Sequence, residues 1–222
     1  MAGITDDAVV AALRRHGISI PRICLGQAKK VGLETAVGAA VLMRESSGGQ
    51  NVFGHDPTIF VGAGLVTKQK FLAYRQARDM PHHGSNCQGV GPVQLTFVGF
   101  QDQADALGGC WNPSNNVHVG FATLARNIHQ SGSLWKGLHD YNGSGPAAVA
   151  YANAVVQSVA LWRGFLAGAA VPAEDLDPAL PQAAFPDLAP PENVGDLERA
   201  PARAGPTDED FAAMQQEGIF GS

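Results

Sequence analysis

An abrupt change of composition after Gly168 constrains the fold more than any other feature of the sequence. Eight of the 14 prolines lie beyond that residue. Up to residue 169 the chain carries thirteen Lys and Arg against nine Asp and Glu, whereas the rest carries two against eleven. A segment so rich in proline and negative charge cannot bury enough apolar surface to order itself. We therefore expect one folded domain over residues 1–168 and a Pro-rich acidic linker over 169–205.

The last segment, 206–222, differs from the linker. Thr207 and the three acids after it form a good helix start, and Phe211, Met214 and Phe220 could share one apolar face. The pattern fits either a short C-terminal helix that docks on a protein partner or a disordered end with scattered apolar residues.

Apolar residues within the first 168 positions recur mostly at helical spacing. The pattern predicts helices over 5–17, 21–32, 33–45, 67–78, 96–108, from 114 or 115 to beyond 128, over 134–139 and over 146–166. Between them, residues 51–64 indicate a small β-hairpin or an ordered loop, and 81–91 indicate a loop. The sequence therefore predicts a mainly α domain with a small hairpin insertion.

Export and membrane signals are not evident in the sequence. The longest apolar stretch, 36–43, is far below the ~20 residues that a transmembrane helix needs. The first residues have neither the basic nor the apolar region of a secretion signal. We expect no membrane insertion and no signal peptide. The weak positive charge of the domain suits an anionic polymer such as a cell wall but does not discriminate a wall from nucleic acid. We predict no nucleic-acid partner.

Neither the cysteines nor the histidines form a recognisable site. Cys24, Cys87 and Cys110 match no disulfide framework and no metal-binding pair. Cys87 and Cys110 could form a disulfide, although an odd count in a chain without a signal favours reduced thiols. The adjacent His82 and His83 cannot readily direct both imidazoles at one ion. We therefore predict no metal and no other cofactor.

Glu45 is the residue whose position best suits acid catalysis. Cleavage of a glycosidic bond near neutral pH requires a protonated acid beside the leaving oxygen, and a carboxyl group serves when an apolar pocket raises its pKa. Glu45 closes an apolar helix and precedes a turn, 46–49, that leaves room for a substrate. Considered alone, a glutamate at a helix end is equally an ordinary solvated residue.

Five short motifs occur in an order that resembles the soluble lytic transglycosylase and goose-type lysozyme superfamily. They are Glu-Ser-Ser-Gly-Gly at 45–49, Gly-Val-Gly-Pro-Val-Gln-Leu-Thr at 89–96, Asn-Asn-Val at 115–117 with Gly120 and Leu124, Tyr-Asn-Gly at 141–143, and Tyr-Ala at 151–152. The resemblance covers roughly residues 31–151. It implies a lysozyme-like α+β fold, with a helical bundle around a glycan cleft.

The resemblance also implies a role for each matching residue. Glu45 would be the catalytic acid and then the base, and Tyr141 its hydrogen-bond partner. Ser46 would face the substrate, Gln94 would contact sugar in the cleft, and Asn142 would bind substrate and support its turn. For Gln94 and Tyr141, packing without a catalytic role is the alternative.

A second carboxylate would decide between two reactions. An inverting hydrolase needs a base about 6.5–9.5 Å from the acid, whereas a lytic transglycosylase lets the muramic acid C6 hydroxyl attack and needs one carboxyl. Asp56, in a turn-prone Gly-His-Asp-Pro segment, is the best candidate base, although it could equally cap its own turn. Asp79 is the next candidate.

The predicted function is cleavage of peptidoglycan between N-acetylmuramic acid and N-acetylglucosamine. A non-catalytic wall-binding or virion structural module with the same fold is one alternative, and a cysteine peptidase using Cys24 or Cys87 is another. A chain without a signal and with an acidic tail resembles phage endolysins or virion-associated lysins. Such lysins act on the wall from the host cytoplasm at lysis or from within a virion. A bacterial enzyme secreted by another route is the alternative.

Overall fold

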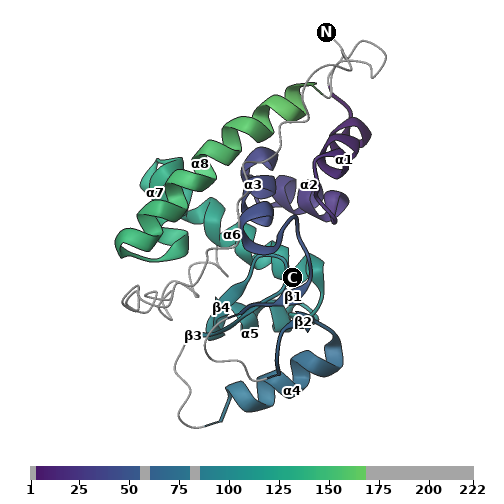
Figure 1. The fold of residues 1–222 in the computed structure, drawn as a ribbon, viewed down its shortest axis with the longest axis vertical. Helices are drawn as coiled ribbons and strands as arrows, with labels where there is room; N and C mark the ends of the chain where they lie inside the picture. The colour runs from purple at the N-terminus through teal and green to yellow at the C-terminus, as the bar shows by residue number, and fades with distance from the viewer. Residues whose placement is uncertain (1–3, 56–60, 81–85, 169–222) are drawn as a thin grey trace.

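The structure is a computed structural model that describes residues 4–55, 61–80 and 86–168. Within these ranges the chain forms eight helices and four short strands (Figure 1). The helices are α1 (Asp6–Arg15), α2 (Pro21–Lys30), α3 (Thr35–Ser46), α4 (Lys68–Arg78), α5 (Val98–Ala106), α6 (Pro113–Ser131), α7 (Leu134–Asn142) and α8 (Gly145–Gly168). The strands are β1 (Val52–Phe53), β2 (Gly64–Leu65), β3 (Asn86–Val90) and β4 (Leu95–Phe97). The predicted mainly α class is confirmed, whereas the predicted linker and C-terminal segment lie outside the described residues.

Local sequence explains where most helices begin. The Thr5 hydroxyl accepts a hydrogen bond from the Ala8 amide at the start of α1, and Thr67 caps α4 in the same way. α6 begins at Pro113, one or two residues before the predicted start at 114 or 115. Asn112 caps this helix, because Pro113 occupies the first helical position, where a missing N–H costs nothing.

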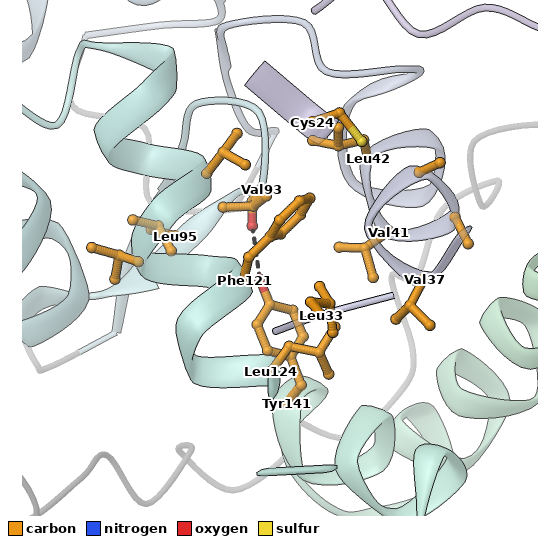
Figure 2. Packing of buried hydrophobic residues seen from close by; sticks show 14 of the residues in the cluster. Cys24, Leu33, Val37, Val41, Leu42, Val93, Leu95, Phe121, Leu124 and Tyr141 are labelled. Carbon is orange, nitrogen blue, oxygen red and sulfur yellow. Dashed lines mark hydrogen bonds between the residues drawn. The ribbon is translucent and has the colours of Figure 1, made fainter. Parts of the chain in front are cut away.

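The apolar core surrounds α3. Every residue from Ala36 to Leu42 is buried, so this helix presents apolar side chains in all directions. α8 packs along α3 and α7, and α6 packs against α2 and α7. A methyl group added at Gly38 would lie 2.7 Å from the Phe121 ring, so glycine permits this close approach. Figure 2 shows Phe121 among the side chains of Val41, Val93 and Leu124.

A four-stranded antiparallel sheet, in the order β2-β1-β3-β4, lies beside the helical body (Figure 1). The β1–β2 pair confirms the hairpin expected within residues 51–64. β3 corrects the prediction of a loop over 81–91. Its sequence, Asn-Cys-Gln-Gly-Val, lacks the pattern of a strand with one buried face. The adjacent residues Cys87 and Gln88 point to opposite faces, and both are buried.

Buried polar side chains hold α4, α5 and the sheet together. The Tyr74 hydroxyl lies 3.2 Å from Gln88 O and 3.1 Å from Gln101 Oε1. Gln101 Nε2 donates to Gln88 O at 3.0 Å and to Leu95 O at 2.7 Å. Arg78, whose side chain is 2% exposed, donates to Gln101 Oε1 at 3.0 Å. We call these four residues, Tyr74, Arg78, Gln88 and Gln101, the polar network.

None of the helices in the described ranges has both the length and the apolar character that a membrane span requires.

Candidate functional site

Glu45 lies in the last turn of α3, as the sequence predicts, and is half-buried. The helix ends because Ser47 adopts a left-handed conformation (φ 51°), followed by Gly48 at φ 95°. A Cβ added at Gly48 would lie 2.1 Å from the carbonyl oxygen of Gly17, so only glycine fits there. The Ser-Ser-Gly-Gly sequence therefore fixes where the Glu45 carboxyl leaves the helix.

Tyr151 of α8 is the hydrogen-bond partner that the structure gives to Glu45. Its hydroxyl donates to Glu45 Oε1 at 2.6 Å, across 106 positions of sequence. The Tyr151 residue is 5% exposed, and its ring centroid lies 6.5 Å from that of Tyr141. A buried donor at Oε1 fixes the orientation of the carboxyl group.

Tyr141, which the motif comparison assigns to Glu45, contacts the turn between β3 and β4, and its bond to Glu45 stays a prediction. Its hydroxyl donates to the backbone carbonyl of Val93 at 3.4 Å (Figure 2). A Cβ added at Gly120 would lie 3.1 Å from this hydroxyl and 2.5 Å from Val93. Tyr141 thus holds the turn between β3 and β4 against α6. The Tyr-Ala motif at 151–152 was the available signal for Tyr151, but no sequence pattern indicated that its hydroxyl bonds the Glu45 carboxyl.

Ser46 corrects the expectation that this side chain faces the substrate. It is 7% exposed, and its hydroxyl donates to the carbonyl of Pro92 at 2.6 Å while accepting from the Gly49 amide at 3.1 Å. The hydroxyl therefore joins the end of α3 to the β3–β4 turn. Its role is to position the residue before it.

Gln94 ends the β3–β4 turn in a left-handed conformation (φ 47°). Its Nε2 donates to Val52 O at 3.0 Å and to Gly91 O at 2.7 Å, and the side chain is half-buried. In this arrangement the amide nitrogen binds the protein's own backbone. Contact of Gln94 with sugar stays a prediction.

Asn116 supports the same turn from α6, a role that the sequence did not suggest. It is fully buried, its Nδ2 donates to Val90 O at 2.8 Å, and its Oδ1 accepts from the Val93 amide at 3.2 Å. A Cβ at Gly91 would lie 2.5 Å from the Asn116 amide group. Close packing on Asn116 therefore requires the second glycine of the Gly-Val-Gly motif, whereas a Cβ at the first, Gly89, would lie 2.6 Å from Gln94 Oε1.

Asn142 was expected in a turn, but α7 continues through it and ends there. It is half-buried and directly precedes Gly143, whose φ of 127° redirects the chain into α8. Its predicted binding role stays a prediction.

The other described carboxylates are held in ion pairs with Arg, Lys or His. They are Asp6, Asp7, Glu34, Asp79, Asp102, Asp105 and Asp140. Asp79, the second candidate base, accepts from Arg78 Nε at 2.7 Å. Each of these carboxylates is therefore already bound to a cationic or histidine side chain. Asp56, the first candidate base, lies outside the described residues.

Comparison of the chain with models of protein families, with curated proteins and with solved structures found no match. The geometry of the site itself is therefore the basis for its chemistry.

The cysteines are poor candidates for a nucleophile. All three are free and buried. Burial raises the pKa of Cys24 to about 12 and that of Cys110 to about 12, and it also raises the pKa of Cys87. Because the thiolate is the reactive form, these thiols are inert near neutral pH, which argues against the cysteine peptidase. Among the described residues no three His, Cys, Asp or Glu side chains are grouped to hold a metal ion, and His82 and His83 lie outside them.

Proposed function

We propose that the chain cleaves the glycan strands of peptidoglycan between N-acetylmuramic acid and N-acetylglucosamine, with Glu45 as general acid and then general base. The observation that carries the proposal is the half-buried Glu45 carboxyl at a helix end, oriented by the buried Tyr151 hydroxyl at 2.6 Å. General acid catalysis requires this kind of fixed carboxyl group within reach of the leaving oxygen.

In the first step the Glu45 carboxyl gives its proton to the glycosidic oxygen while the bond to the muramic acid C1 breaks. Tyr151 holds Oε1 during this transfer. In the second step the Glu45 carboxylate accepts the proton of the hydroxyl that attacks C1. When that hydroxyl is C6–OH of the same sugar, the product is a 1,6-anhydro ring, and one carboxyl suffices.

Attack by water would instead make the protein a muramidase, and an inverting one needs a second carboxylate. Asp79 is engaged by Arg78 Nε at 2.7 Å, which leaves Asp56 as the candidate base. The transglycosylase route is the simpler of the two, because it uses Glu45 alone.

We also propose the superfamily to which the domain belongs and the biological setting in which it acts. The motif order supports a lysozyme-like fold of the transglycosylase and goose-type lysozyme kind. The weakly basic domain and the acidic Pro-rich tail support a phage lysin that acts on the wall and uses the tail to bind a protein partner.

Glu45→Gln tests the proposal, with Glu34→Gln as the matched control on the same helix's N-terminal side. Glu34 is an exposed glutamate paired with Arg163. We expect Glu45→Gln to lower the rate of glycan cleavage from purified peptidoglycan by ~10²–10⁴-fold, the usual worth of a general acid. Glu34→Gln should stay within about twofold of wild type. Full activity of a folded Glu45→Gln would refute the assignment, and an inactive wild type would favour the non-catalytic module.

Tyr151→Phe, compared with Tyr141→Phe, tests which tyrosine orients the carboxyl. Loss of a hydrogen bond to a carboxylate should lower kcat about tenfold in Tyr151→Phe and leave KM nearly unchanged. Tyr141→Phe removes the bond to Val93 O and should have the smaller effect on kcat. The reverse order of effects would return the partner role to Tyr141.

A further inference from the structure

Trp135 forms a rigid, exposed aromatic surface away from Glu45's hydrogen-bonded carboxyl. The residue is 37% exposed, whereas Trp162 is fully buried and Trp111 is half-buried against Phe71. One face of its ring stacks on His139, with centroids 5.2 Å apart and an interplanar angle of 25°. Its Nε1–H donates to Asn153 Oδ1 at 2.8 Å. Because His139 covers one face, the exposed area belongs to the opposite face and the ring edge.

The neighbours of Trp135 form two parallel stripes. Residues 135, 139 and 142 share one side of α7, and residues 146, 149 and 153 share one side of α8, because both sets follow helical spacing. The two helices pack side by side (Figure 1), and the Trp135–Asn153 hydrogen bond joins the stripes. We call this surface the α7–α8 face. It consists of Trp135, His139, Asn142, Pro146, Val149 and Asn153, each exposed or half-buried.

We propose that the α7–α8 face is a second glycan-binding surface, which holds the strand outside the bond being cleaved. A flat indole face suits the C–H face of a pyranose ring, and the amides of Asn142 and Asn153 suit sugar hydroxyls and N-acetyl groups. The charged neighbours Lys136 and Asp140 pair with one another and leave the face nearly neutral.

Two features favour a glycan over a protein as the occupant. The face has one large aromatic residue and one exposed aliphatic residue, Val149, whereas protein-docking surfaces need a larger contiguous apolar area. It also presents the side-chain amides of Asn142 and Asn153 near the indole ring, and amides can bind the hydroxyl and N-acetyl groups of a sugar. The inference rests on the proposed function for the identity of the glycan.

Pelleting with insoluble purified peptidoglycan tests the inference in the full chain carrying Glu45→Gln, which removes turnover. Adding Trp135→Ala should weaken binding roughly tenfold, in line with the loss of one aromatic stacking contact. Adding Leu161→Ala, which removes an equally exposed apolar side chain (46%) elsewhere on α8, should leave binding unchanged. Trp135→Phe should give an intermediate affinity.

Equal affinity with and without Trp135 would overturn the inference, as would a parent protein that does not pellet. Unchanged glycan binding together with lost self-association in sedimentation would show a protein contact instead, and would also overturn it. The proposed function is tested separately, by measuring the glycan fragments that the wild-type chain releases from peptidoglycan. A wild type that cuts while Trp135→Ala binds normally refutes only the second surface.

Discussion

The helical body around α3 and the sheet with α4 and α5 are stabilised in different ways. In the body, α3 is surrounded by apolar side chains, packed as closely as Phe121 is on Gly38. In the sheet region, the interior holds the polar network, with Gln101 at its centre. Loss of a large apolar side chain leaves a cavity in the body, whereas loss of one member of the network leaves buried polar groups without their partners.

The candidate site lies where the two regions meet. Glu45 comes from the body, and the β3–β4 turn with Gln94 comes from the sheet region. The Ser46 hydroxyl joins them through Pro92 O at 2.6 Å. The body therefore supplies a rigid carboxyl, and the sheet region determines what surrounds it. The following substitutions test this contrast, from the largest expected effect to the smallest.

Phe121→Ala should be the most destabilising change, because it empties the centre of the apolar body. Phe121 is fully buried, and loss of a buried phenyl group costs about 3–5 kcal/mol in the free energy of unfolding. Urea denaturation would measure it, with the exposed Leu161→Ala as the control. A loss below about 1 kcal/mol would contradict close packing of α3 on α6.

Gln101→Leu should cost about 2–3 kcal/mol in the free energy of unfolding, because Arg78 loses an acceptor and Leu95 O loses its donor. Gln103, on the same helix, is the matched control. Its amide atoms are buried and have no hydrogen-bond partner among the described residues. Gln103→Leu should therefore be neutral or stabilising. If both substitutions lower the free energy of unfolding by the same amount, the hydrogen bonds of the polar network do not stabilise the fold.

Ser46→Ala tests the junction between the two regions. The loss of one buried hydrogen bond should cost about 1–2 kcal/mol in unfolding free energy. The rate of glycan cleavage should also fall several-fold, since Glu45 would be less firmly placed. Ser131→Ala, at an exposed hydroxyl that bonds its own helix, is the control. A stability loss without any change in rate would show that the junction does not position the acid.

Glu34→Gln should have the smallest effect and should depend on pH. Hydrogen bonds from Arg163 hold the pKa of Glu34 below its ordinary value of 4.5, against an opposing effect of partial burial. A lowered pKa in the folded state stabilises the protein above the ordinary value, and this contribution is lost as pH falls through the lowered pKa. The Tm difference between wild type and variant should therefore shrink in acid. A difference that grows in acid would contradict the pairing.

The sequence predicted the helical body well, because its elements carry their own signals. The apolar run of α3 followed by Ser-Ser-Gly-Gly identified both the helix end and Glu45, and Thr5 and Thr67 identified two caps. These features depend on neighbours in sequence, so local patterns are sufficient to find them.

The sheet region was predicted poorly, and the hydrogen bond from Tyr151 to Glu45 was not predicted, because both depend on contacts distant in sequence. β3 is held by pairing with β1 and β4 and by a hydrogen bond from Gln101. None of these contacts can be predicted from the five residues of β3 alone. Tyr151 reaches Glu45 from 106 positions away, while the Tyr-Asn-Gly motif directed attention to Tyr141. The burial of Ser46 was not predicted, because its position next to Glu45 in the sequence does not show whether its hydroxyl faces a cleft or the protein interior.

The most direct test of the central claim is mass spectrometry of the muropeptides released from purified peptidoglycan by the wild-type chain and by Glu45→Gln. We predict that wild type releases fragments with anhydromuramic ends, each lighter than the reducing product by one water molecule, and that Glu45→Gln releases almost none. Reducing ends would establish a muramidase and make Asp56 the next residue to substitute. Glycan fragments released equally by both proteins would contradict the claim that Glu45 performs the cleavage.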